Sequence, residues 1–232
     1  MNLEKNYTKI LSQIEDSLKN SRFGQKVDLV AVTKTISPKI IDRAIGLGVE
    51  HIAENRVQEI RRKYTEVTKS PTLKWHQIGS LQTNKVKYII DKVELIHSLD
   101  RYDLAKEIDR QAKKFDKLQR CLVQVKISEE ESKQGADKAD VLRLVSEIKR
   151  DLPNIVICGL MGMAPYYEDP ERSRKYFAHL RRIFEEIKES GLVDQSFEHL
   201  SMGMSNDFRV AIEEGSTMVR IGSALFSEAD LR

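Results

Sequence analysis

The feature that most constrains the fold is a regular alternation of strand-like and helix-like segments along the chain. Short apolar runs rich in Val, Ile and Leu occur at residues 27–33, 50–54, 74–80, 93–99, 119–127, 155–163, 197–202 and 217–222. Helical patterns follow them at 38–47, 55–68, 83–91, 101–116, 137–150, 170–190 and 206–214. Because strands that alternate with helices pair in parallel through right-handed crossovers, this pattern predicts a parallel α/β sheet.

Residues at the segment ends support these boundaries. Ser37 and Asp169 each precede a proline, which is the usual start of a helix. Three helical patterns end in a glycine before the next strand, as left-handed helix caps do: Gly48, Gly191 and Gly215. The strand-like runs are apolar throughout rather than alternating, which indicates strands covered on both faces.

Eight strand–helix units in 232 residues favour a closed (β/α)8 TIM barrel. We expect one domain over residues 1–232, with the amphipathic segment near the N-terminus as an extra helix packed on the barrel. An open sheet is the alternative. The first strand is not followed by a G-x-G-x-x-G motif, so a dinucleotide-binding fold has little support.

Composition and charge argue against nucleic-acid and membrane partners. The net charge is only +3, and basic runs such as 61–63 and 172–182 fall in helical patterns, where we expect solvent-exposed faces. No apolar stretch approaches a membrane span, and the N-terminus has no signal-peptide core. Cys121 and Cys158 lie in strand-like runs and are expected to be buried free thiols. These features predict a cytoplasmic protein.

Lys34 is the first candidate functional residue. It follows the first strand on the same face as Val30 and Val32, a face that would point into a packed interior if those two apolar residues do. A lysine there is costly unless it reaches solvent or does chemistry. In TIM barrels the functional face is formed by the C-terminal ends of the strands, where Lys34 lies. His76, in the third strand, is expected to be a core histidine that orients its neighbours.

The last two strands lead into "SMGMSND" and "RIGSALF". Loops after the seventh and eighth strands commonly bind phosphate in such barrels, so Ser205, Gly222 and Ser223 are predicted to cradle one. A lysine that forms a Schiff base, together with a phosphate site, suggests pyridoxal 5'-phosphate (PLP) or a sugar phosphate. Arg220 shares a strand face with Gly222. We expect it to face the pyridine nitrogen of PLP and, as a cation, to weaken the cofactor's electron sink.

Seven segments together resemble the pyridoxal phosphate homeostasis proteins, single-domain relatives of the alanine racemase N-terminal barrel. They are "AVTKT", "AENRVQE", "WHQIGSLQTNK", "SKQG", "GLMGMAP", "LSMGMSND" and "GSTMVRIGSALF". The resemblance implies that Lys34 holds PLP as a Schiff base and that Asn55 lies beside the ring. It also implies the same phosphate and pyridine ligands as above, and a cytoplasmic monomer. Lys126 and Lys133 are candidates for a second, transient PLP contact.

Two classes of function compete. The resemblance implies a non-catalytic carrier or regulator that affects PLP supply and amino-acid balance, with apo PLP-dependent enzymes as candidate recipients. The alternative is a PLP-dependent, racemase-like enzyme, but the chain has no room for the separate β-domain whose tyrosine serves as the second base in alanine racemases. A sugar-phosphate aldolase is a third interpretation of the same lysine and phosphate site.

Overall fold

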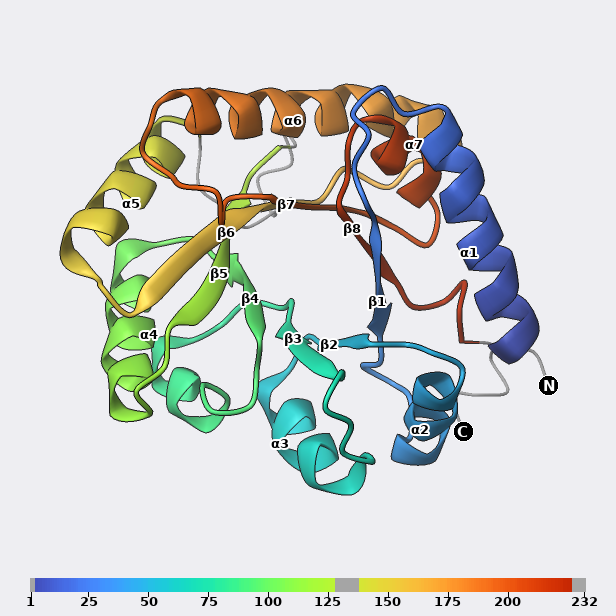
Figure 1. The fold of residues 1–232 in the computed structure, drawn as a ribbon, viewed down its shortest axis with the longest axis horizontal. Helices are drawn as coiled ribbons and strands as arrows, with labels where there is room; N and C mark the ends of the chain where they lie inside the picture. Colours follow the sequence, from blue (N-terminus) through green and yellow to red (C-terminus); the bar gives the residue numbers. More distant parts are fainter. Residues whose placement is uncertain (1–2, 128–137, 227–232) are drawn as a thin grey trace.

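Eight parallel strands close into a barrel in the computed structural model, which describes residues 3–127 and 138–226. Each strand pairs with the next along the chain, and β8 pairs with β1 (Figure 1). The strands are β1 (Asp28–Val32), β2 (His51–Glu54), β3 (Lys74–Gln77), β4 (Leu95–Leu99), β5 (Gln119–Val125), β6 (Ile155–Gly162), β7 (His199–Met204) and β8 (Met218–Ile221). The predicted barrel is confirmed, and the open-sheet alternative is wrong.

Helices surround the barrel; the first of them precedes the first strand, and the others connect successive strands. They are α1 (Leu3–Lys19), α2 (Pro38–Gly46), α3 (Val57–Glu66), α4 (Tyr102–Lys114), α5 (Lys138–Asp151), α6 (Arg174–Glu189) and α7 (Phe208–Glu213), with the 3-10 helices η1 (Thr83–Tyr88) and η2 (Pro170–Ser173). The helix predicted at 83–91 is therefore only a short 3-10 helix. Strand β7 begins two residues later than predicted, because the Phe197 amide closes a turn on the Asp194 carbonyl at 3.1 Å.

The helix ends follow the sequence signals with one difference. The Asp169 carboxylate accepts a hydrogen bond from the Glu171 amide at 3.1 Å, as expected of an N-cap. Ser37 occupies the N-cap position of α2, but its side chain makes no capping bond. All three predicted C-cap glycines have positive φ: Gly48 at 106°, Gly191 at 70° and Gly215 at 93°.

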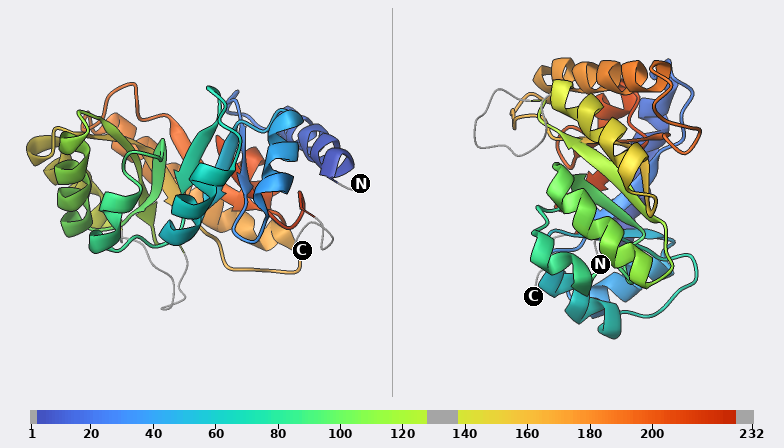
Figure 2. Two further views of the ribbon diagram at one scale, coloured as in Figure 1. Left: turned by 90° about the horizontal axis from the view of Figure 1, so that it is seen from below. Right: turned by 90° about the vertical axis from the view of Figure 1, so that its left-hand side faces the viewer.

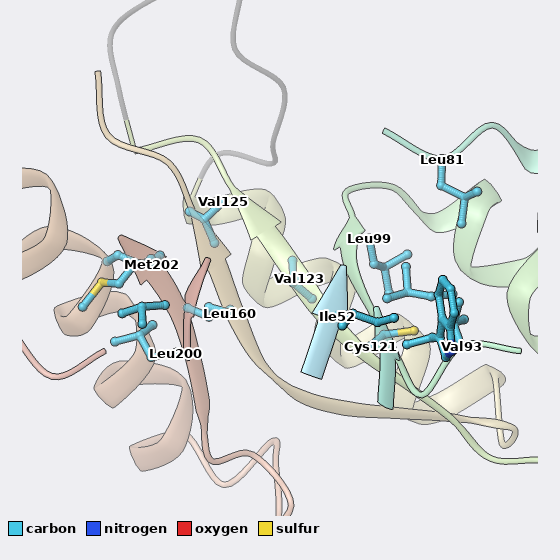
Figure 3. Packing of buried hydrophobic residues seen from close by; sticks show 14 of the residues in the cluster. Ile52, Leu81, Val93, Leu99, Cys121, Val123, Val125, Leu160, Leu200 and Met202 are labelled. Atoms are coloured by element: carbon cyan, nitrogen blue, oxygen red, sulfur yellow. The ribbon is translucent and has the colours of Figure 1, made fainter. Parts of the chain in front are cut away.

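Alternate residues of the strands form two apolar layers. Outward-facing side chains pack against the helices, and Figure 3 shows part of this layer, with Leu160 on β6 and Leu200 on β7. Inward-facing side chains fill the barrel, where Val30 and Cys158 belong to one buried cluster. Cys121 lies in the outer layer, and both cysteines are buried free thiols, as predicted.

The predicted extra helix is α1. Leu3, Ile10 and Ile14 on one of its faces are buried, at the spacing that an amphipathic helix requires. The helix lies beside α7 at one end of the molecule, and α4 and α5 lie together at the opposite end (Figures 1 and 2). None of the helices within the described ranges combines the length and hydropathy needed to cross a bilayer.

Candidate functional site

A cavity of about 620 Å³ opens where the strands end. This volume is in the usual range for small-molecule sites. All six predicted ligand-binding residues line it: Lys34, Asn55, Ser205, Arg220, Gly222 and Ser223. Apolar side chains complete the walls: Val32, Ile78, Met163 and Met204. The barrel thus brings residues of its first, second, seventh and eighth units into one site.

Lys34 continues the interior face of β1 beyond the end of the strand. Val30 is fully buried inside the barrel, Val32 is partly buried in the cavity wall, and the Lys34 side chain is exposed. The lysine therefore occupies an inward-facing position without losing its hydration, because the barrel opens at that level. Its amine lies where a ligand that enters the cavity can meet it.

The cavity wall formed after β7 and β8, next to β1, carries a cluster of backbone amides and hydroxyls. The Ser205 hydroxyl oxygen accepts bonds from the backbone amides of Gly222 at 3.2 Å and Ala224 at 3.3 Å. Asp207 shapes this turn, because its carboxylate accepts a bond from the Met204 amide at 2.7 Å. Backbone amides that converge on one point form an anion-binding nest, so this wall is suited to a phosphate group.

Arg220 lies deeper, at the base of the cavity. Its side chain is buried, with Nη1 donating to Ser201 Oγ at 2.6 Å and Nη2 donating to the Gly162 carbonyl at 3.1 Å. Burial lowers the pKa of Arg220 to about 10, so the guanidinium remains a cation at neutral pH. Two fixed acceptors therefore orient a buried positive charge beside the cavity.

Asn55 is held in place by a close approach of two loops. A Cβ atom at Gly79 would lie 2.1 Å from the Asn55 carbonyl oxygen, a distance that no side chain could occupy. Gln77 Nε2 donates to the Gly79 carbonyl at 2.9 Å and stabilises the same turn. Only glycine at position 79 lets the two chain segments meet at the cavity wall.

A buried ion pair behind Lys34 was not predicted. Lys63 Nζ donates to Glu54 Oε1 at 2.8 Å and to the Thr33 carbonyl at 2.6 Å, and Thr33 Oγ1 donates to the same carboxylate at 2.7 Å. The expectation that the basic run 61–63 is solvent-exposed is therefore wrong for Lys63, which is 1% exposed. Val57, Ile60 and Lys63 share the buried face of α3, and this spacing was the signal available in the sequence.

A row of buried histidines crosses the barrel below the cavity. His76 is hydrogen-bonded to His51 at 3.0 Å and to His97 at 2.8 Å, which confirms it as a core histidine with satisfied partners. His97 in turn contacts Ser201 Oγ at 3.0 Å. Burial lowers the pKa of His76 and of His97 well below the usual histidine range, so both are neutral.

Lys126 and Lys133 are the two candidates for a second contact with PLP. Lys126 follows β5 but is not among the residues that line the cavity, so a contact with a ligand there stays a prediction. Lys133 lies outside the described residues. Tyr166, which the sequence did not single out, also lines the cavity and is 77% exposed.

A parallel eight-strand barrel with this cavity at the strand ends defines a class of small-molecule-binding TIM barrels. Comparison with known protein families identifies the family to which this barrel belongs. The sequence model of the family described as "Alanine racemase, N-terminal domain" matches residues 11–230. The chain belongs to this family and, within it, to the pyridoxal phosphate homeostasis proteins.

Relatives and solved structures agree over nearly the whole chain. The pyridoxal phosphate homeostasis protein of Aquifex aeolicus is 43% identical over 229 residues, which cover 98% of this chain and 99% of that protein. The structure of PipY from Synechococcus elongatus without PLP has a TM-score of 0.86 at 32% identity. The structure of PipY with PLP bound has a TM-score of 0.84 at 31% identity, and both comparisons cover 97% of this chain and all of PipY.

Proposed function

We propose that this protein binds PLP through Lys34 and serves as a carrier or regulator in PLP homeostasis. The observation that carries the proposal is that the Lys34 amine and the amide cluster around Ser205 lie in the walls of one cavity. PLP supplies an aldehyde that a primary amine can attack, with release of one water as the C=N bond forms. A small ligand that carries both a phosphate and an aldehyde matches these two groups in one cavity.

The remaining donors and surfaces also fit the cofactor. The amides of Gly222 and Ala224, with the hydroxyls of Ser205 and Ser223, would hold the phosphate. The Arg220 guanidinium would face the pyridine nitrogen. The apolar side chains in the wall would contact the ring, and Asn55 would lie beside it. The names of the relatives and the PLP-bound PipY structure support the same ligand.

Two features favour a carrier over an enzyme. A cationic Arg220 beside the ring would oppose protonation of the pyridine nitrogen, and protonation is what makes PLP a strong electron sink. The Lys34 side chain is exposed at the cavity mouth, so solvent and partner molecules have access to the attachment point. Exchange of cofactor needs such access, whereas catalysis on PLP usually needs a closed site. Apo PLP-dependent enzymes are the proposed recipients.

The test is a titration of the purified, cofactor-free protein with PLP, followed by absorption spectroscopy and by assays with single amino acids. We expect stoichiometric uptake, a visible absorption band distinct from that of free PLP, and no substantial turnover of any amino acid. Turnover that depends on Lys34 would replace the carrier by a racemase-like enzyme. Failure to take up PLP, with binding of a sugar phosphate instead, would favour the aldolase.

A further inference from the structure

A single line of hydrogen bonds connects the cavity to the opposite end of the barrel. It runs from Arg220 to Ser201 Oγ at 2.6 Å and on to His97 Nδ1 at 3.0 Å. From His97 Nε2 it passes to His76 Nδ1 at 2.8 Å, and from His76 Nε2 to His51 Nδ1 at 3.0 Å. These five side chains come from five different strands, and all are less than a tenth exposed.

The cavity end of this line fixes the direction of every bond. Arginine can only donate, so Ser201 Oγ accepts from Arg220 and keeps its one proton to donate. Among the described residues its other hydrogen-bond partner is His97 Nδ1. A buried hydroxyl proton without an acceptor is costly, so the favoured arrangement has His97 Nδ1 accepting from Ser201. A neutral imidazole that accepts at Nδ1 carries its proton on Nε2. His97 then donates to His76, and His76 donates to His51.

The far end selects the same direction independently. If His97 donates to His76 and His76 donates to His51, then His51 also carries its proton on Nε2. This nitrogen lies 4.0 Å from the Asp28 carboxylate. An N–H facing a carboxylate is favourable, whereas the reversed chain would place an imidazole lone pair there. The charged groups around His51 are Asp28, Lys74, Glu50 and Glu94. The contacts at both ends of the line thus favour the same tautomer, Nε2–H, at all three histidines.

We propose that Ser201, His97, His76 and His51 are positioning residues for Arg220, acting as one directed hydrogen-bond chain with each histidine in the Nε2–H form. The chain holds the guanidinium as an oriented cation at the base of the cavity. The chain reaches from the cavity to the N-terminal ends of the strands. Ser201 and the three histidines are not among the residues that line the cavity, so they would act on a ligand there through Arg220. The link to PLP rests on the proposed function, but the chain itself does not.

The first test needs no cofactor. Long-range ¹⁵N–¹H NMR of the labelled protein at pH 7.5 distinguishes the two histidine tautomers and the imidazolium. We expect His51, His76 and His97 all to be neutral with the proton on Nε2. Any one of them in the Nδ1–H or doubly protonated form would overturn the directed chain.

The second test breaks the chain at its link to the arginine. In S201A the Nη1 group of Arg220 loses a charge-assisted bond, so we expect its Nη1–H protons to exchange with water at least about tenfold faster. S201T, which keeps the hydroxyl, should restore slow exchange. S216A is the matched control, because the Ser216 hydroxyl is also fully buried but its hydrogen-bond partners within the described ranges are all backbone carbonyls. Equal exchange in S201A and S216A would overturn the positioning role.

A cofactor measurement separates this inference from the proposed function. If the protein binds PLP, S201A should weaken binding about tenfold and shift the absorption maximum, with S216A close to wild type. Wild-type binding and spectrum in S201A would contradict positioning of Arg220. A wild-type protein that binds no PLP would count against the proposed function, while the NMR experiments would still decide the chain.

Discussion

The ammonium group of Lys63 donates to the carbonyl oxygen of Thr33 at 2.6 Å, one peptide before Lys34. The same ammonium is paired with Glu54, which is fully buried. Helix α3 is thereby bonded to the backbone from which the candidate cofactor lysine extends. Burial raises the pKa of the Glu54 carboxyl, and the hydrogen bonds from Lys63 and Thr33 oppose that shift.

Removing this ammonium should destabilise the fold. K63M leaves the Glu54 carboxylate buried without its cation, so we expect the free energy of unfolding to fall by about 3–5 kcal/mol. Guanidinium denaturation measures this loss. The control is R62M on the adjacent, solvent-exposed position of α3, whose ion pairs with Glu59 and Glu66 should contribute little. Similar stability in K63M and R62M would show that the buried pair does not hold the fold together.

A methyl group at Gly79 should distort the cavity wall. Because the added Cβ would overlap the Asn55 carbonyl, G79A should cost about 1–3 kcal/mol of stability and weaken ligand binding at the cavity. In G46A the added Cβ meets no atom within 4 Å, and the residue ends α2, so stability should be unchanged or slightly higher. Thermal denaturation of both variants checks the contrast, and a G79A protein as stable as G46A would contradict the close approach of the two loops.

Acid should destabilise the protein through its buried histidines. Burial lowers the pKa of His76 and of His97 below the ordinary value of 6.5, so the unfolded chain binds more protons than the folded protein below that pH. Stability therefore rises with pH through this range, and it falls below pH 6.5 by at most about 1.4 kcal/mol per pH unit for each histidine. The limit for the two together is about 4 kcal/mol at pH 5, reached when neither takes up a proton in the folded state.

Guanidinium titrations at pH 7.5, 6 and 5 measure that slope. A variant with one histidine fewer, H76Q, should lose less stability on acidification than the wild type, although it starts lower. A stability that stays flat from pH 7.5 to pH 5 would mean that the histidines are protonated in the folded state, contrary to their burial.

The Ser205 hydroxyl should contribute to the affinity of the cavity for anions. S205A removes a hydroxyl that would donate to the anion and that holds the Gly222 and Ala224 amides together, so we expect affinity for inorganic phosphate, and for PLP, to fall about tenfold. S80A changes a serine on the other side of the same cavity and should leave phosphate affinity near wild type. Isothermal titration calorimetry with phosphate compares the two. Loss of phosphate binding in S80A but not in S205A would place the anion elsewhere.

The sequence allowed the strand order and the composition of the cavity to be predicted, because both depend on local signals and on one topological rule. Lys34 and Ser205 each follow a strand, and parallel barrel strands end at the same face. Their meeting in one cavity therefore needed no knowledge of side-chain packing. Asn55, in contrast, was expected in the site only because the family resemblance implied it.

The buried polar groups could not be predicted in the same way, because they depend on register and on contacts between units. His76 lies opposite Ala53 on β2 and Leu95 on β4. This stagger brings His51 and His97 to its two sides, and spacing within a single strand does not reveal it. Lys63 was misread for a related reason: a basic run on a helix is usually solvated, and only the position of Glu54 on the facing strand makes a buried lysine tolerable.

The most direct test of the proposed function is to locate the site of PLP attachment. The protein is loaded with PLP, reduced with borohydride, digested, and mapped by mass spectrometry, with K34A and, as a control on an exposed lysine of α2, K39A treated in parallel. We predict one pyridoxyl adduct, on Lys34, that is present in K39A and lost in K34A. An adduct on another lysine, or undiminished labelling of K34A, would contradict the account.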